Sequence, residues 1–290
     1  MGTSTAYGGP GGGTPLVPSW LGSDSTGPVP AAPDGLPSGA PSAPDASPPA
    51  PPSRPAIPAP ADPGRFAGAR SNFSRFARSG GSDRASLGRA VSDYVSTSSG
   101  GAHQAAQRMG ASRGVGARLL GFLTDAQARG SSAALRELNL DQLAGRPIDE
   151  VFAGLADSIC PNGGTVDDGI AREAFIETII ELTTLGVTDF DALSAGQIQT
   201  VFELYVTHAI EARLCNDIGT KVITAPADAS AALRVQEQLH DFIRNGVSDA
   251  LTATRAETPA LTLDSVQSFV DLVYERAFSI LKALGDAVAN

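Results

Sequence analysis

Proline is concentrated at the N-terminal end of this 290-residue chain, where 17 of its 21 prolines lie at or before Pro63. Proline has no amide hydrogen and interrupts both helix interiors and central strands. The same segment contains few large apolar side chains, so burial cannot offset the entropic cost of ordering its backbone. The sequence therefore predicts a long disordered Pro/Gly-rich N-terminal tail, followed by a folded part of about 205 residues.

The tail has two parts that differ in composition. Residues 1–21 form a Gly-rich leader, and residues 22–82 are predicted to be a disordered Pro/Ala/Ser-rich linker with an Arg/Phe segment at its end. A flexible chain of this length spans roughly 50 Å, and polyproline stretches lengthen it. We expect the linker to be a tether, and residues 83–290 to be the folded domain.

Helical signals dominate this domain. Apolar residues recur at helical spacing and strand-like alternation is nearly absent, so we expect an all-α domain, either a helical bundle or an irregular helical array. The best strand candidate is residues 221–225. Two capping boxes, Thr165 with Asp168 and Ser194 with Gln197, predict helix starts. The predicted helices cover residues 84–95, 102–108, 116–128, 149–159, 165–185, 194–217, 229–252 and 263–287.

The two cysteines, Cys160 and Cys215, have no disulfide framework to form, because a domain of this size can bury a sufficient core. They are expected to be reduced thiols in the cytoplasm. No basic segment precedes an apolar core as in a signal peptide, and no stretch approaches the ~20 apolar residues of a membrane span. The sequence predicts a cytoplasmic protein without membrane contact.

Charge is distributed unevenly along the chain. Residues 54–118 carry ten Arg and three Asp, whereas residues 119–290 carry 11 basic and 25 acidic residues. An acidic body is a poor surface for wrapping duplex DNA, which needs a cationic face.

His208, Glu211 and Cys215 follow one another at i, i+3 and i+7, which would align them on one helix face as metal ligands. A zinc site needs three or four ligands, and His103 and His240 lie on weakly linked segments. We therefore interpret the three as ordinary helix-surface residues, with Cys215 as a small core residue, and predict no metal and no cofactor.

The segment that starts at Cys160 could be a nucleophile ahead of an anion-binding helix start. Asp167 and Asp168 in the first helical turn would repel phosphate, however, and they complement the helix dipole instead. The structural interpretation is a turn over residues 162–164 with Thr165 as the helix cap. Since no dinucleotide, phosphate-loop, zincin or serine-hydrolase motif is present either, we predict that this chain is not an enzyme.

An Arg/Phe segment interleaves cationic and aromatic residues, the types that bind single-stranded nucleic acid. The alternatives are docking to an acidic partner and packing against this protein's own acidic body, and nucleic acid is the less favoured of these. The residues concerned are Arg70, Phe73, Arg75, Phe76 and Arg78.

The extreme N-terminus is the most specific feature of the sequence. Gly2 is small, so removal of Met1 should leave a free glycine amine, and Ala6 stands where a myristoylation signal requires Ser or Thr. Leu16, Val17 and Trp20 are apolar residues expected to anchor the leader in a partner's groove. The alternative is a low-complexity end without a role.

The chain contains Met1-Gly-Thr-Ser-Thr, a Gly-rich run and the Pro15-Leu-Val-Pro-Ser-Trp20 segment, followed by a Pro-rich spacer and a helical C-terminal part. In these features it resembles the QatB family, the B components of bacterial Qat anti-phage defence systems. The resemblance implies a component of phage defence encoded beside an ATPase, a cyano-deazaguanine-synthase-like (QueC-like) enzyme, QatC, and a TatD-like nuclease.

The resemblance also suggests a role for the leader. Synthases of the QatC type activate a carboxylate with ATP and let an amine displace the adenylate, and Gly2 would be that amine. The helical domain would dock partners. The residues expected to contact QatC are Thr3, Ser4, Thr5, Tyr7, Gly8, Gly9, Leu16, Val17 and Trp20. Alternatives are a purely non-covalent adaptor and a nucleic-acid-sensing subunit that uses residues 70–78.

Overall fold

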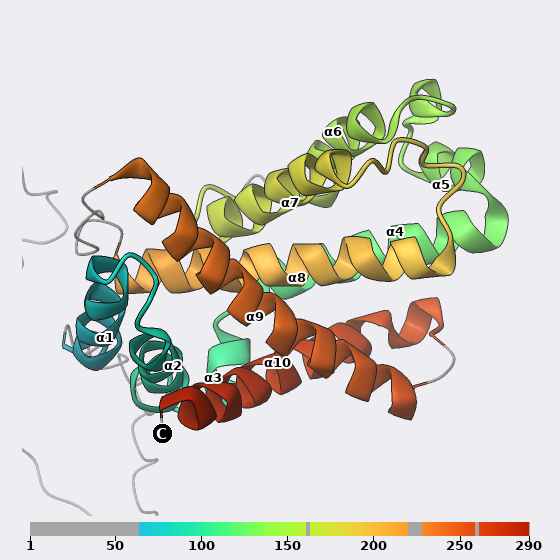
Figure 1. Cartoon of the computed structure of the whole chain (residues 1–290). Helices are drawn as coiled ribbons and strands as arrows, with labels where there is room; N and C mark the ends of the chain where they lie inside the picture. Colours follow the sequence, from blue (N-terminus) through green and yellow to red (C-terminus); the bar gives the residue numbers. More distant parts are fainter. Residues whose placement is uncertain (1–63, 161–162, 220–227, 259–260, 290) are drawn as a thin grey trace, which may run out of the picture. The chain divides into compact units, whose positions relative to one another are not determined.

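The protein is described by a computed structural model that covers residues 64–160, 163–219, 228–258 and 261–289 (Figure 1). The tail up to residue 63, with the leader and most of the linker, lies outside the described residues. Within the described ranges the chain is all-α and contains no β-strand, as predicted. Its helices are α1 (Ala67–Arg78), α2 (Arg84–Asp93), α3 (Ala102–Gln107), α4 (Gly110–Arg129), α5 (Ser131–Glu137), α6 (Ile148–Ile159), α7 (Val166–Thr184), α8 (Ala195–Ile218), α9 (Ala229–Glu257) and α10 (Val266–Ala289).

All eight helices predicted from the sequence are present, with shifted ends. Helix α4 begins six residues before the prediction, and α9 continues five residues past it, to Glu257. Helix α5 was not predicted, because its seven residues are too few to show a helical repeat. The strand candidate at residues 221–225 lies outside the described residues.

Both predicted capping boxes are confirmed. The Thr165 side chain accepts a hydrogen bond from the Asp168 amide, and the Asp168 side chain accepts one from the Thr165 amide. Ser194 and Gln197 make the same reciprocal pair at the start of α8. Short polar motifs therefore fix where the two helices begin.

The core is continuous from α1 to α10. Helix α10 packs against α2 and α9, and α8 packs against α4, α7 and α9, so α8, α9 and α10 connect the parts of the array seen in Figure 1. The largest fully buried side chains include Tyr94, Tyr205, Tyr274, Phe152, Phe175, Phe202 and Phe278. No helix among the described residues is long and apolar enough to cross a membrane.

The predicted linker, residues 22–82, extends too far along the chain, because its last part is folded. Residues 67–78 form α1, which packs against α2, and Phe66, Phe73 and Phe76 are at most 6% exposed. Arg70 donates from Nε to the carbonyl oxygen of Ile218 at 2.8 Å and so caps the end of α8. The residues that look like a charged linker are thus part of the folded domain.

Candidate functional site

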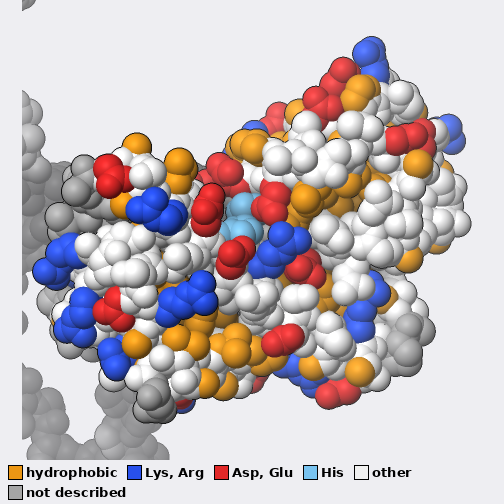
Figure 2. All heavy atoms as spheres, viewed as in Figure 1, with side chains coloured by type: hydrophobic (Ala, Val, Ile, Leu, Met, Phe, Trp, Pro, Cys, Tyr) orange, Lys and Arg blue, Asp and Glu red, His pale blue; other side chains and the backbone are white. Residues whose placement is uncertain are grey.

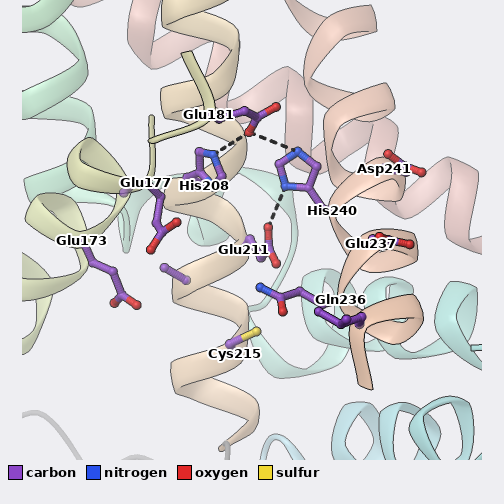
Figure 3. Close-up of a pocket in the computed structure, with 13 residues that line it drawn as sticks. Glu173, Glu177, Glu181, His208, Glu211, Cys215, Gln236, Glu237, His240 and Asp241 are labelled. Carbon is purple, nitrogen blue, oxygen red and sulfur yellow. Dashed lines mark hydrogen bonds and ion pairs between the residues drawn. The ribbon is translucent and has the colours of Figure 1, made fainter. Parts of the chain in front are cut away.

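A cavity of about 680 Å³ lies between α7, α8 and α9 (Figure 3). Helix α7 contributes side chains from its middle and C-terminal part, α8 from its C-terminal half and α9 from its first half. The lining residues are Glu173, Ala174, Glu177, Glu181, His208, Glu211, Ala212, Cys215, Leu233, Gln236, Glu237, His240 and Asp241.

The cavity is strongly acidic. Six of its described lining residues are carboxylates, and none of them is Lys or Arg. In Figure 2 histidine side chains are visible at the surface, with several acidic side chains and a basic one next to them. The site is therefore open to solvent, and its field favours a cation over an anion.

Two histidines meet a single carboxylate at one end of the cavity. The rings of His208 and His240 are 5.1 Å apart between their centroids. Glu181 lies between them, with its Oε2 atom 2.8 Å from Nε2 of His208 and 3.7 Å from Nε2 of His240. One potential ligand atom from each of the three residues lies within 4.8 Å of the other two.

Further polar groups hold this cluster in place. Nδ1 of His240 lies 3.0 Å from Oε2 of Glu211, and because a carboxylate only accepts, Nδ1 carries the proton. Nε2 of His240 is thereby turned toward Glu181. Arg244 donates to Oε1 of Glu181 and to Glu203, both at 3.3 Å, which leaves Oε2 of Glu181 directed at the histidines.

The two histidines differ in proton affinity. Burial lowers the pKa of His208, and the nearby His240 lowers it further, despite the contact with Glu181. The hydrogen bond that His240 donates to Glu211 raises the pKa of His240 and outweighs the opposing effect of burial. A neutral His208 imidazole has one N–H and one lone pair, and the lone pair lies on Nε2 when the ring proton is on Nδ1.

The sequence-based interpretation of this site was partly correct. His208, Glu211 and Cys215 do share one face of α8, since all three line the cavity. They are not ordinary surface residues, however, because the side chains of His208 and Glu211 are each only 14% exposed. Glu181 and His240 were missed as partners of His208: they lie 27 and 32 positions away, and no local spacing signals such an approach.

The helix cap predicted for the Cys160 segment is confirmed. Its capping box opens α7, and Asp167 also pairs with Arg213. Cys160 is 2% exposed, and burial raises the pKa of its thiol to about 11, which is unfavourable for a nucleophile. Pro161 and Asn162 lie outside the described residues.

The Arg/Phe segment cannot bind nucleic acid in the way its sequence suggests. Phe73 and Phe76, at 2% and 0% exposed, pack in the core and cannot stack on bases. Arg75 and Arg78 are exposed, while Arg70 is bound to the end of α8. The alternative that the segment packs against this protein's own body is the one that the fold adopts.

The predicted leader residues, from Gly2 through Thr3, Ser4, Thr5, Tyr7, Gly8, Gly9, Leu16 and Val17 to Trp20, all lie outside the described residues. Their roles therefore stay predictions.

Comparison with known proteins identifies the helical domain. A family model described as "Qat anti-phage system associated protein QatB" matches residues 100–281, which include most of the core and the whole histidine cavity. No curated protein and no solved structure matches the chain. Because the family model covers more than half of the chain, this protein belongs to the QatB family and is a component of a Qat anti-phage defence system.

Proposed function

We propose that this chain is a non-enzymatic subunit of a Qat defence complex, whose N-terminal leader is bound and modified by the QueC-like partner QatC. The observation that carries the proposal is Gly2 behind Met1 at the start of a Gly-rich leader, in a chain whose helical domain belongs to the QatB family. The helical domain docks the partner enzyme, and the Qat ATPase and TatD-like nuclease are further candidate partners.

The α-amine of Gly2 suits acyl transfer. Its unperturbed pKa of about 8 leaves a substantial neutral fraction near pH 7, whereas lysines titrate near 10. QatC would first join its carboxylate substrate to ATP, releasing pyrophosphate. The Gly2 nitrogen would then attack the acyl carbon, form an amide bond and expel AMP, while the amine gives up a proton.

The rest of the leader is suited to delivery of this amine. Glycine has no side chain, so Gly8 and Gly9 allow the backbone to approach an active site closely. Tyr7 and Trp20 offer aromatic surface for an entry groove. The Pro-rich residues 29–63 provide reach from the helical domain.

Intact-mass analysis after coexpression with QatC tests the modification. The wild-type N-terminal peptide should gain the mass of one acyl group, and a catalytically inactive QatC should abolish the gain. Gly2→Ala, which keeps a primary amine, should still be modified. Gly2→Pro, whose amine is secondary and confined to a ring, should not. An unshifted peptide beside active QatC would disprove the modification.

A second candidate function is a purely non-covalent adaptor, favoured by the apolar residues Leu16, Val17 and Trp20 in an otherwise small-residue leader. In this case the wild-type chain would show no mass shift. Gly2→Pro would leave copurification with QatC intact, whereas Trp20→Ala would abolish copurification. The two functions thus differ in the N-terminal mass and not only in binding.

A further inference from the structure

We propose that Glu181, His208 and His240 form a binding site for a divalent transition-metal ion of the Zn²⁺ type. The site lies entirely within α7, α8 and α9, one ligand from each helix, so the proposal does not depend on modification of Gly2. Nothing in the family description assigns a metal to this domain.

The spacing of the donor atoms suits such an ion. Zinc binds imidazole nitrogen and carboxylate oxygen at about 2.0–2.2 Å, which places neighbouring ligand atoms of a tetrahedral site about 3.3–3.5 Å apart. The distances from Oε2 of Glu181 to the two Nε2 atoms, 2.8 and 3.7 Å, lie on either side of this value. Small side-chain rotations would therefore bring all three donors to bonding distance without moving the helices.

The surrounding hydrogen bonds support the same role. Metal-binding histidines commonly donate their other ring nitrogen to a carboxylate, which fixes the tautomer and the ring orientation. His240 donates in this way from Nδ1 to Oε2 of Glu211, at 3.0 Å. Arg244 holds Oε1 of Glu181 and so orients Oε2 toward the imidazoles.

The donor set also indicates which metal fits. Two imidazoles with one carboxylate suit zinc and neighbouring first-row ions, whereas magnesium and calcium prefer all-oxygen sites. Three protein ligands leave a fourth position for water or for a group from a partner. The cavity carboxylates Glu173, Glu177 and Glu237 add attraction for a divalent cation.

The competing explanation is a self-contained ionic network, in which Oε2 of Glu181 simply accepts hydrogen bonds from both histidines. Such a network would need no ion. The two explanations differ in stoichiometric Zn²⁺ binding, which only the metal site predicts.

Zn²⁺ titration of the tag-free, chelator-treated full chain against a chromophoric competitor tests the proposal. One equivalent should bind at micromolar or lower concentration, and bound Zn²⁺ should raise the Tm. His208→Gln and His240→Gln should each weaken binding at least tenfold. His103→Gln is the matched control: His103 pairs with Glu275 outside the cavity, so its loss should leave Zn²⁺ affinity unchanged.

A second measurement needs no variant and therefore does not depend on whether the substituted chains fold. Zn²⁺ should protect His208 and His240 of the wild-type chain from modification by diethyl pyrocarbonate, while His103 stays reactive, as read by peptide mass spectrometry. Binding only at millimolar Zn²⁺, equal affinity in the folded His208→Gln and His240→Gln variants, or unchanged labelling of all three histidines would each overturn the proposal.

Discussion

Two buried tyrosines differ in a single hydrogen bond. Tyr205 and Tyr274 are both 0% exposed, and the Tyr205 hydroxyl donates to the Ser112 carbonyl oxygen at 3.0 Å. The Tyr274 hydroxyl has no hydrogen-bond partner among the described residues. A buried polar group without a partner carries a desolvation cost that the fold does not recover.

The pair gives a matched prediction. Tyr205→Phe should lower the free energy of unfolding by about 1 kcal/mol, because it removes a satisfied hydrogen bond. Tyr274→Phe should be neutral or stabilising, because it removes an unsatisfied hydroxyl and keeps the ring. Urea unfolding followed by circular dichroism measures both. Equal losses in the two variants would mean that Tyr274 has a partner after all.

The Cys160 thiol should be protected from alkylation both by its burial and by its raised pKa. Burial raises its pKa to about 11, and the thiolate is the reactive form, so its thiolate fraction at pH 8 should be roughly a hundredfold below that of an exposed thiol. Alkylation of the folded chain should be correspondingly slow and accelerate about tenfold per pH unit up to that pKa. Peptide mass spectrometry after iodoacetamide treatment measures the rate, with the urea-unfolded chain as control. Comparable rates in the two states would contradict the buried position.

At the scale of helices, α2 and α10 cross at a pair of glycines. A Cβ atom at Gly285 would lie 2.5 Å from the Gly88 carbonyl oxygen, and one at Gly88 would lie 2.6 Å from the Gly285 oxygen. The backbones can approach this closely only because both positions lack a side chain. A glycine inside a helix is otherwise unfavourable. The presence of Gly88 and Gly285 is therefore explained by the close contact between α2 and α10 and not by helix propensity.

Gly285→Ala should therefore destabilise the protein by about 1–3 kcal/mol, since α2 and α10 must separate to accept the new methyl group. Gly121→Ala in α4 is the control, because no described atom outside its own helix lies within 4 Å of a Cβ there. The free energy of unfolding of the Gly121→Ala variant should rise by about 0.5–1 kcal/mol, because alanine has a higher helix propensity than glycine. Thermal and urea unfolding report both, and a Gly285→Ala variant as stable as wild type would exclude the close crossing.

Helix boundaries also show which signals the sequence carries locally. The starts of α7 and α8 were predicted because their capping boxes are made by residues three positions apart. The sequence places α1 in the linker, because its Arg and Ser residues obscure the apolar face made by Phe73, Phe76 and Ala77. Only packing against α2 shows that this face is buried.

At the scale of the whole molecule, truncation can test whether the folded domain includes Phe66 and α1. A chain that begins at residue 64 keeps the entire described core, so it should unfold at the same temperature as the full chain. A chain that begins at residue 83 loses Phe66, Phe73 and Phe76. Each buried phenylalanine contributes about 1.5–3 kcal/mol, and their sum is a large part of a typical domain stability. The shorter chain should be largely unfolded by circular dichroism; if it matched the longer one, α1 would be dispensable.

The sequence by itself determined the helical class, most helix positions, both capping boxes and the family to which the leader points. These features depend on neighbours within a few positions, where spacing and residue type decide the outcome. Tertiary structure alone decided that α1 belongs to the core and that Glu181, His208 and His240 meet. The physical reason is that these contacts join separate helices: the placement of His240 beside His208 depends on how α9 packs against α8, which no local pattern of residues specifies.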